Sequence, residues 1–297
     1  MKRSLVFWTL SFLITAGTLI YQRITGPTYP LSGNVALDGK ELHYKLERTH
    51  PGATNHIVKI ETDHEGVSGV IGWKRHKTAD EWTCVPMIYN NGFLTAELPV
   101  QPPAGKLDYN VTLQEGAESV MIPSNQPVVI RFRGEVPSLV LIAHILAMFI
   151  GLLLSVRAGF ECFATEPRLG KLTLWTIIFT ALGGLVFGPL MQWYAFGEFW
   201  TGLPFGIDFT DNKTALALLF WIIAGIVLLR KKKSTRWVLI ASAVTLIVYL
   251  IPHSLLGSEV DYSKVGHTQL HPTRNQNGLP AHFISDRNYI SHYKPEC

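Results

Sequence analysis

Charged residues are scarce in this 297-residue chain: they make up 16% of the sequence, whereas hydrophobic residues make up 47%. Soluble globular domains carry about 25% charged residues, so the composition argues against an ordinary soluble protein. The basic residues behind the formal net charge of +4 stand out as short clusters beside apolar segments. We therefore expect a membrane protein and no nucleic-acid partner.

Motifs of catalysis are missing as well. The chain has no Walker A loop, no Gly-x-Ser-x-Gly nucleophile elbow and no His-Glu-x-x-His metal motif. The apolar segments also lack the ladder of charged residues that marks an ion pathway. Neutral polar residues such as Thr176 and Ser242 nevertheless keep a small transporter among the alternatives. The sequence therefore contains no motif that would predict an enzyme.

Cysteine is rare, with three residues at positions 84, 162 and 297. They form neither a Cys-x-x-Cys redox pair nor the Cys-x-x-Cys-His sequence that attaches c-type haem. Cys84 and Cys297 fall on the same predicted side of the membrane. An oxidising compartment there would allow a disulfide between them.

Five apolar segments are the dominant feature, at residues 5–20, 139–156, 172–191, 215–229 and 237–251. A helix needs roughly 20 apolar residues to cross a hydrocarbon core of about 30 Å, and the shorter segments reach this length with their flanks. Basic residues cluster at 2–3, 157–171 and 230–236. Since short loops rich in Lys and Arg mark the cytoplasmic side, one topology puts all three clusters there: N-terminus inside and C-terminus outside.

The stretch between the first two apolar segments has the pattern of an all-β domain. Hydrophobic and polar residues alternate over 42–46, 107–113 and 128–132, as in half-buried strands. Turn signals rich in Pro, Gly and Asn separate these runs. About seven short strands in about 100 residues predict an immunoglobulin-like sandwich, with Trp73 as its core tryptophan.

The predicted fold is a membrane α-helical bundle of about five transmembrane helices with an inserted extracytoplasmic all-β immunoglobulin-like sandwich. Residues 1–27 form a retained signal anchor, because no clean cleavage site follows the apolar run; a cleaved signal peptide is the alternative. Residues 28–135 form the β-sandwich, 136–252 the four-helix membrane region, and 253–297 an extracytoplasmic tail. This layout is typical of a multi-pass protein of the bacterial inner membrane.

His144 lies inside the second apolar segment, where ionisable residues are uncommon and suggest a function. His253 follows the fifth segment on the same predicted side, and Met148 lies one turn from His144. These three could ligate a b-type haem or a copper ion. A histidine that packs between helices through a hydrogen bond is the simpler alternative, because His253 is expected at the interface.

Two further groups could bind metal ions. His267 and His271 in the tail have the i, i+4 spacing of zinc or copper ligands on a helix, although a following proline and the lack of an apolar pattern argue against a helix there. Asp208 and Asp211 form an acidic cluster that could hold calcium. Capping of the next helix by Asp211 or Asn212 is the simpler interpretation of that cluster.

The external loop at 193–213 is rich in aromatic residues, among them Trp193, Trp200 and Phe205. Such residues are typical of the membrane–water interface. Together with the nearby aspartates, the β-sandwich and the tail, the loop would present one external interaction surface.

The expected function follows from this layout. We expect a non-catalytic accessory or structural subunit of a larger bacterial membrane complex, of a respiratory or electron-transfer kind. Its expected partners are the lipid bilayer and other membrane-protein subunits. A membrane electron carrier that binds haem or copper through His144 and His253 is the alternative.

Overall fold

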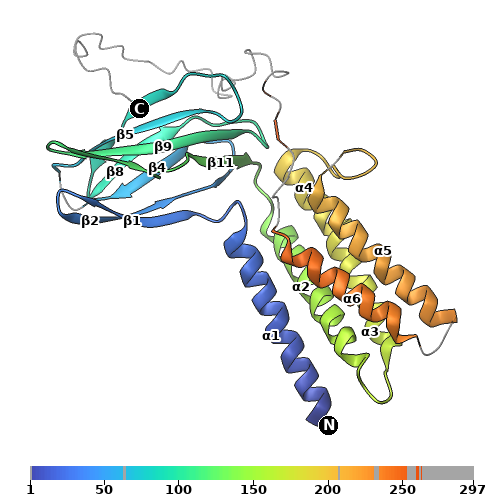
Figure 1. Ribbon diagram of the computed structural model, residues 1–297. Coiled ribbons are helices and arrows are strands. Elements are labelled where there is room, and N and C mark those ends of the chain that lie inside the picture. Colours follow the sequence, from blue (N-terminus) through green and yellow to red (C-terminus); the bar gives the residue numbers. More distant parts are fainter. Residues whose placement is uncertain are drawn as a thin grey trace. The chain divides into compact units, whose positions relative to one another are not determined.

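The computed structural model describes residues 2–62, 65–206, 208–230, 234–252, 259–260 and 262. The chain divides into two compact units (Figure 1). Met1–Tyr29 and Gly134–Ser258 form the helical unit, and Pro30–Arg133 and Glu259–Cys297 form the β unit. The prediction of apolar helices combined with a separate β region is thereby confirmed. The chain enters the β unit twice, once after the first helix and once after the last.

The helical unit is built from α-helices and one π-helix: α1 (Lys2–Thr25), α2 (Ser138–Glu161), α3 (Leu169–Ala181), η1 (Leu182–Phe187), α4 (Gly188–Phe196), α5 (Phe209–Arg230) and α6 (Thr235–Leu250). Within the described residues, four helical stretches are long and apolar enough to cross a membrane: Arg3–Thr25, Ser138–Glu161, Leu169–Phe196 and Phe209–Arg230. α6 is apolar but has 16 residues, which span about 24 Å at 1.5 Å per residue. The fifth predicted segment thus forms a shorter helix than the others.

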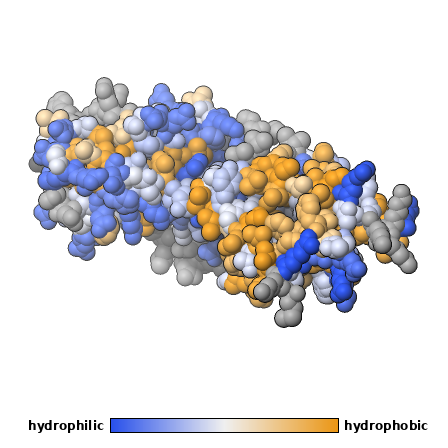
Figure 2. Space-filling view, turned by 60° about the horizontal axis from the view of Figure 1, so that its bottom comes forward, coloured by the Kyte–Doolittle hydropathy of each residue, from blue (hydrophilic) through white to orange (hydrophobic). Residues whose placement is uncertain are grey.

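Apolar side chains cover the outside of the helical unit, while polar side chains are bonded inside it. Figure 2 shows hydrophobic residues gathered over the helices and a largely hydrophilic face on the β unit. Inside, Trp221 Nε1 donates to Thr245 Oγ1 at 2.8 Å, and Ser242 Oγ donates to the Ser155 carbonyl at 2.9 Å. A Cβ on Gly159 would lie 2.5 Å from Ser242 Oγ, so this small residue lets two helices approach. Such packing suits lipid, where polar groups find no water.

Eleven strands are described in the β unit: β1 (Leu31–Leu37), β2 (Lys40–Leu46), β3 (Thr49–Pro51), β4 (His56–Glu61), β5 (Ser68–Arg75), β6 (Thr83–Pro86), β7 (Ile88–Asn90), β8 (Phe93–Leu98), β9 (Lys106–Glu115), β10 (Glu118–Ile122) and β11 (Val128–Arg133). β1 and β2 form a hairpin. The largest sheet has the order β3-β11-β9-β5-β6, with β10 also paired to β9, and a third sheet has the order β4-β8-β7. β11 pairs with β3 in parallel, and the other pairs are antiparallel.

The core of the β unit is centred on β9. Leu107, Tyr109, Val111 and Leu113, which the sequence pattern predicts on one face, are all fully buried. The buried Tyr109 hydroxyl donates to the Glu47 carbonyl at 2.8 Å, which satisfies the only polar atom of that side chain. The alternation in the sequence therefore predicted this core strand correctly.

Two histidines face each other at the start of β4. The Nδ1 atoms of His50 and His56 lie 3.2 Å apart, so one ring must donate and the other accept. His50 also packs edge-on against Phe132, with ring centroids 5.6 Å apart. Burial, reinforced by the nearby His50, lowers the pKa of His56 to about 4, while Glu47 has a smaller opposite effect.

The lowered pKa of His56 predicts that the β unit is sensitive to acid. The folded state keeps this imidazole neutral down to about pH 4, whereas the unfolded chain protonates it below pH 6.5. The contribution of neutral His56 to the free energy of unfolding is therefore fully present above pH 6.5. It is lost between pH 6.5 and 4, and the loss at pH 5 is on the order of 1–2 kcal/mol. We expect the His56→Gln chain to lose less stability than the wild type between pH 7 and pH 5, measured by urea unfolding in detergent.

A substitution of the exposed His43 on β2 provides the matched control. His43→Gln should follow the wild-type pH dependence, because this side chain is not buried. Equal losses in the wild type and His56→Gln would show that another group causes the acid sensitivity.

Candidate functional site

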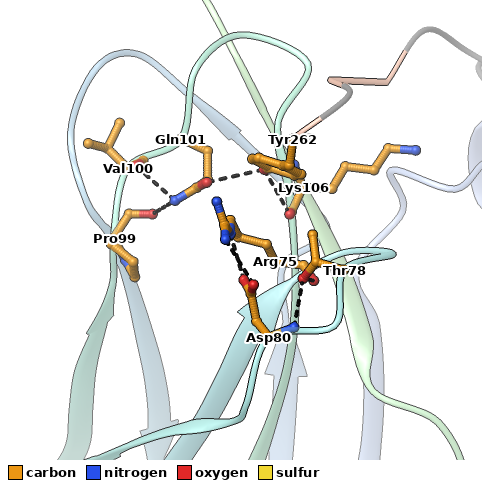
Figure 3. Close-up of polar contacts among 8 residues, drawn as sticks. All are labelled: Arg75, Thr78, Asp80, Pro99, Val100, Gln101, Lys106 and Tyr262. Atoms are coloured by element: carbon orange, nitrogen blue, oxygen red, sulfur yellow. Dashed lines mark hydrogen bonds and ion pairs between the residues drawn. The ribbon is translucent and has the colours of Figure 1, made fainter. Parts of the chain in front are cut away.

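A cleft of about 510 Å³ lies at one end of the β unit. Antiparallel pairing puts Arg75, the last residue of β5, opposite Leu107 near the start of β9. The turn after β5 and the loop before β9 therefore meet at this end (Figure 3). Residues 75–79, Ala104 and Lys106 line this space together with Glu259, Val260 and Tyr262, so the volume is what remains with those last three residues in place. We call the site between residues 75–80 and 99–106, in which these three residues are bound, the tyrosine cleft.

The first wall of the tyrosine cleft is the turn 75–80, which an ion pair holds in shape. Arg75 Nε and Nη2 donate to the two carboxylate oxygens of Asp80 at 2.5 and 2.8 Å, a bidentate geometry that fixes the guanidinium plane. Thr78 Oγ1 donates to the Arg75 carbonyl at 2.9 Å. The hydrogen bond from Arg75 lowers the pKa of Asp80, and the same bond raises the pKa of Arg75. The guanidinium is therefore held charged and in one orientation.

The second wall is the loop 99–106 that leads into β9. The Gln101 amide nitrogen donates to the Pro99 and Val100 carbonyls at 3.2 and 3.0 Å. These two bonds turn the amide oxygen of Gln101 toward the cleft (Figure 3). The hydrogen bonds within the loop thus orient this oxygen so that it can accept a hydrogen bond in the cleft.

The turn at the end of this loop needs glycine. Ala104 has a positive φ of 68°, and the Gly105 N–H donates to the Pro102 carbonyl at 2.8 Å. A Cβ on Gly105 would lie 2.8 Å from that carbonyl and 2.9 Å from the Tyr262 hydroxyl. A larger residue at position 105 would therefore block the approach of the tyrosine.

Two lysines bind the carboxylate of Glu259. Lys106 Nζ lies 2.6 Å from Oε1, and Lys77 Nζ lies 2.8 Å from Oε2. Burial alone would raise the pKa of Glu259, but hydrogen bonds from Lys106 and Lys77 outweigh it and lower the pKa to about 2. The Val260 N–H then donates to the Ala104 carbonyl at 3.4 Å. Charge and backbone together hold this segment.

Tyr262 enters the cleft with both its ring and its hydroxyl (Figure 3). The hydroxyl accepts the Lys106 N–H at 2.8 Å and donates toward Gln101 Oε1 at 3.1 Å and the Lys106 carbonyl at 3.0 Å. The Arg75 guanidinium lies 5.3 Å from the ring centroid, within range of a cation–π interaction. Burial raises the pKa of Tyr262 to about 12, so the hydroxyl keeps its proton and can donate.

The chemistry of the tyrosine cleft is that of binding. Besides the ion pairs above, His76 Nδ1 lies 2.6 Å from Asp108 Oδ1, so every ionisable side chain from the turn and loop that lines the described cleft faces a group able to pair with it. A hydroxyl nucleophile needs a base beside it, whereas the Thr78 hydroxyl is bonded to a backbone carbonyl. The arrangement can hold a polypeptide segment by charge, backbone and one tyrosine.

Comparisons with protein-family models, with curated proteins and with solved structures found no significant match. The function must therefore be inferred from the residues of the chain itself. Sequence reasoning recognised the turn at 102–105 but did not single out the tyrosine cleft. Its parts come from three segments far apart in the sequence, and none of them forms a motif alone.

His144, the predicted haem or copper ligand on α2, contacts the π-helix η1. Its Nδ1 lies 3.0 Å from the Gly183 carbonyl oxygen, and because a carbonyl only accepts, Nδ1 carries the proton. The same carbonyl accepts the Gly188 N–H. A Cβ on Gly183 would lie 2.5 Å from Met148 Sδ, so His144 and Met148 lie against the same π-helix. The hydrogen bond supports the packing interpretation, and a cofactor at this position stays a prediction.

The acidic cluster fixes the loop between α4 and α5, which the sequence predicted to be external, to the start of α5. Asp208 Oδ1 accepts the Thr210 N–H at 2.7 Å, so Asp208 caps the helix, whereas the sequence suggested Asp211 or its neighbour. The difference arises because α5 already begins at Phe209. Asp211 Oδ2 instead accepts the N–H groups of Thr201 and Gly202 at 2.8 and 3.0 Å. Among the described residues, no group of three or more His, Cys, Asp or Glu could hold a metal ion.

The aromatic residues of the same loop form an exposed apolar surface. The Trp193 ring stacks on Phe199 with centroids 5.5 Å apart, and Trp200 Nε1 donates to the Leu203 carbonyl at 3.1 Å. Phe205 is 84% exposed. The role of Trp193, Trp200 and Phe205 at the membrane interface or toward a partner stays a prediction.

Several predicted site residues lie outside the described residues: His253, His267, His271 and Cys297. The haem or copper site with His253 and the tail metal site therefore stay predictions. Cys84 is disulfide-bonded, and Cys162 is a free thiol. The predicted partner of Cys84, Cys297, cannot be placed within the described part of the chain.

The close approach at Gly105 gives a test of the site. Gly105→Ala should push the Tyr262 hydroxyl away from the Lys106 N–H, because the new Cβ would fall 2.9 Å from that hydroxyl. We expect the Lys106 amide to exchange with solvent at least about tenfold faster, measured by hydrogen–deuterium exchange of the full chain in detergent. Gly66→Ala is the control, since its Cβ would meet only Glu115 Oε1 at 3.7 Å. Unchanged protection of Lys106 in Gly105→Ala would contradict the described contact.

The ion pairs of Glu259 predict a second, pH-dependent effect. Since the pKa of Glu259 is lowered from 4.5 to about 2 when the segment is bound, binding is fully supported above pH 4.5 and weakens as the pH falls toward 2. We expect protection of the Lys106 amide, relative to the core amide of Val111, to decline between pH 5 and pH 3. Glu259→Gln should remove most of this decline, and substitution of the exposed Glu65 by Gln should leave it in place.

Proposed function

We propose that this chain is a non-catalytic accessory or structural subunit of a larger complex in a bacterial inner membrane, and that its β unit presents an interaction surface on the extracytoplasmic side. The observation that carries the proposal is the tyrosine cleft. It holds a polypeptide segment through paired charges, a backbone hydrogen bond and a tyrosine, which is how binding modules recognise short segments.

The topology behind this proposal has the N-terminus inside and the C-terminus outside. Basic residues lie at the helix ends that this topology puts in the cytoplasm: Arg3 in α1, Arg157 in α2 and Arg230 in α5. The β unit follows α1 and therefore lies outside.

Binding of the segment after α6 supports five crossings. The β unit contains residues 30–133, and Glu259 and Tyr262 contact it directly, so both parts must lie on the same side of the membrane. An even number of crossings must then separate them. α2, the α3–α4 stretch, α5 and α6 give an even number only if the short α6 also crosses.

The strand order supports an immunoglobulin-like β unit. The order β11-β9-β5-β6 corresponds to strands G, F, C and C′ of that fold, and β4-β8-β7 corresponds to B, E and D. Trp73 lies on β5, the C position, and packs against the core. The chain departs from antibody domains in lacking cysteines on β4 and β9, so the disulfide between strands B and F is absent from this version of the sandwich.

Extraction from native membranes tests the complex. We expect the tagged full chain, solubilised gently, to co-purify with a defined set of other membrane proteins, identified by mass spectrometry and by a size larger than the chain with its micelle. Membranes without the tagged chain give the background. Recovery of the chain alone and monodisperse would overturn the proposal.

A further inference from the structure

The segment in the tyrosine cleft is bound as a ligand would be bound. Among its described residues, the side chains of Glu259 and Tyr262 and the backbone N–H of Val260 contact the walls. The walls are braced without it, because Asp80 fixes Arg75 and the loop carbonyls fix Gln101. A site that is shaped independently of its occupant can accept another occupant of the same chemistry.

We propose that the tyrosine cleft is a recognition site for a segment of a partner protein that carries a glutamate and, three residues later, a tyrosine. Glu259, Val260 and Tyr262 of the chain itself are then a displaceable occupant that a partner's segment replaces. This inference rests on the proposed role as a complex subunit and adds the chemistry of the partner.

The tyrosine hydroxyl carries the specificity. Without it, the Lys106 N–H and the Gln101 oxygen would each lose a partner that the structure gives them at 2.8 and 3.1 Å. Sites built around a hydroxyl reject the analogue that lacks it, because their polar groups are left unpaired. A phenylalanine in place of the tyrosine should therefore bind about tenfold more weakly.

The charges favour a peptide over a small anion. Arg75 is paired with Asp80 and His76 faces Asp108, so these cations are already matched by carboxylates of the β unit. The other two cations, Lys77 and Lys106, form ion pairs with Glu259 of the bound segment. A free anion would satisfy the lysines but would make no use of the aromatic surface above Arg75 or of the hydroxyl partners.

Weak individual contacts make exchange feasible. The Lys77 side chain is 66% exposed and that of Glu259 is 34% exposed, and an ion pair at such a site contributes little. The Lys106 side chain is only 17% exposed, so its pair with Glu259 is the stronger of the two. The occupant stays in place because it belongs to the same chain, which gives it an effective concentration of about a millimolar or more. A variant that cannot occupy its own cleft should therefore bind an added segment much better than the wild type.

A photo-reactive peptide with the sequence of residues 258–263, carrying a diazirine side chain in place of Val260, tests the exchange on the full chain in detergent. We expect it to label Tyr262→Ala at least about tenfold more than the wild type, with cross-links mapped by mass spectrometry to residues 75–80 and 99–106. Glu259→Lys, which reverses the charge of the occupant, gives a second vacated cleft in case Tyr262→Ala folds poorly. The same peptide with Tyr262→Phe should label several-fold less.

Two results would overturn the inference. Equal labelling of the wild type and both vacated variants, or labelling outside the two walls, would show that the cleft does not exchange its occupant. The proposed subunit role fails separately, through recovery of the chain without partners. A third outcome separates the two proposals: the same partners co-purify with the wild type and with Tyr262→Ala, and the peptide labels neither. The chain would then still be a complex subunit, but the tyrosine cleft would not bind its partners.

Discussion

The contact between the Tyr262 hydroxyl and the Lys106 backbone is the interaction on which the rest of the architecture depends. It joins the segment after the last helix to the domain that follows the first helix. In the topology that we propose, the two segments lie on one side of the membrane, so this hydrogen bond requires an even number of crossings between them. The distribution of Lys and Arg, an unrelated property, supports the same proposed topology.

The proposed topology requires the short helix α6 to cross the membrane, and a buried lysine makes this feasible. With 16 residues, α6 spans about 24 Å of a core of about 30 Å, so its last carbonyl groups would lie in an environment without water. Lys213, from the first turns of α5, is 5% exposed and donates through Nζ to the carbonyls of Ile251 and Pro252 at 2.8 and 3.5 Å. A cation at a helix C-terminus satisfies carbonyl groups and opposes the helix dipole. The Lys213 ammonium group thus donates the hydrogen bonds that water would donate to the last carbonyl groups of a helix that reaches the surface.

Sequence patterns predicted the elements of this protein better than its site. Alternation placed the core strand through Tyr109, and apolar runs placed the helices, because both depend on residues that are neighbours in the sequence. The start of α5 was placed too late, since Asp208 caps a polar first turn that carries no apolar signal. The tyrosine cleft could not be found in this way, because Arg75, Gln101 and Tyr262 come together only through the pairing of β5 with β9 and the return of the chain to the β unit. The π-helix beside His144 was equally hidden, since its hydrogen-bond pattern leaves no mark in the sequence beyond two glycines.

An occupant from the same chain also sets the conditions under which a partner can bind. The ion pair of Glu259 with Lys77 is largely exposed and contributes at most about 1 kcal/mol, so an isolated segment would bind only weakly, at about 0.1 mM. The tether supplies a concentration about ten times higher, of about a millimolar or more, and a dilute partner in solution cannot compete with it. A partner held in the same membrane can, because confinement in two dimensions beside the β unit raises its own local concentration to a similar level. With the proposed membrane location, these two effects act together: the cleft is closed to proteins that meet it by diffusion from solution and open to those assembled next to it.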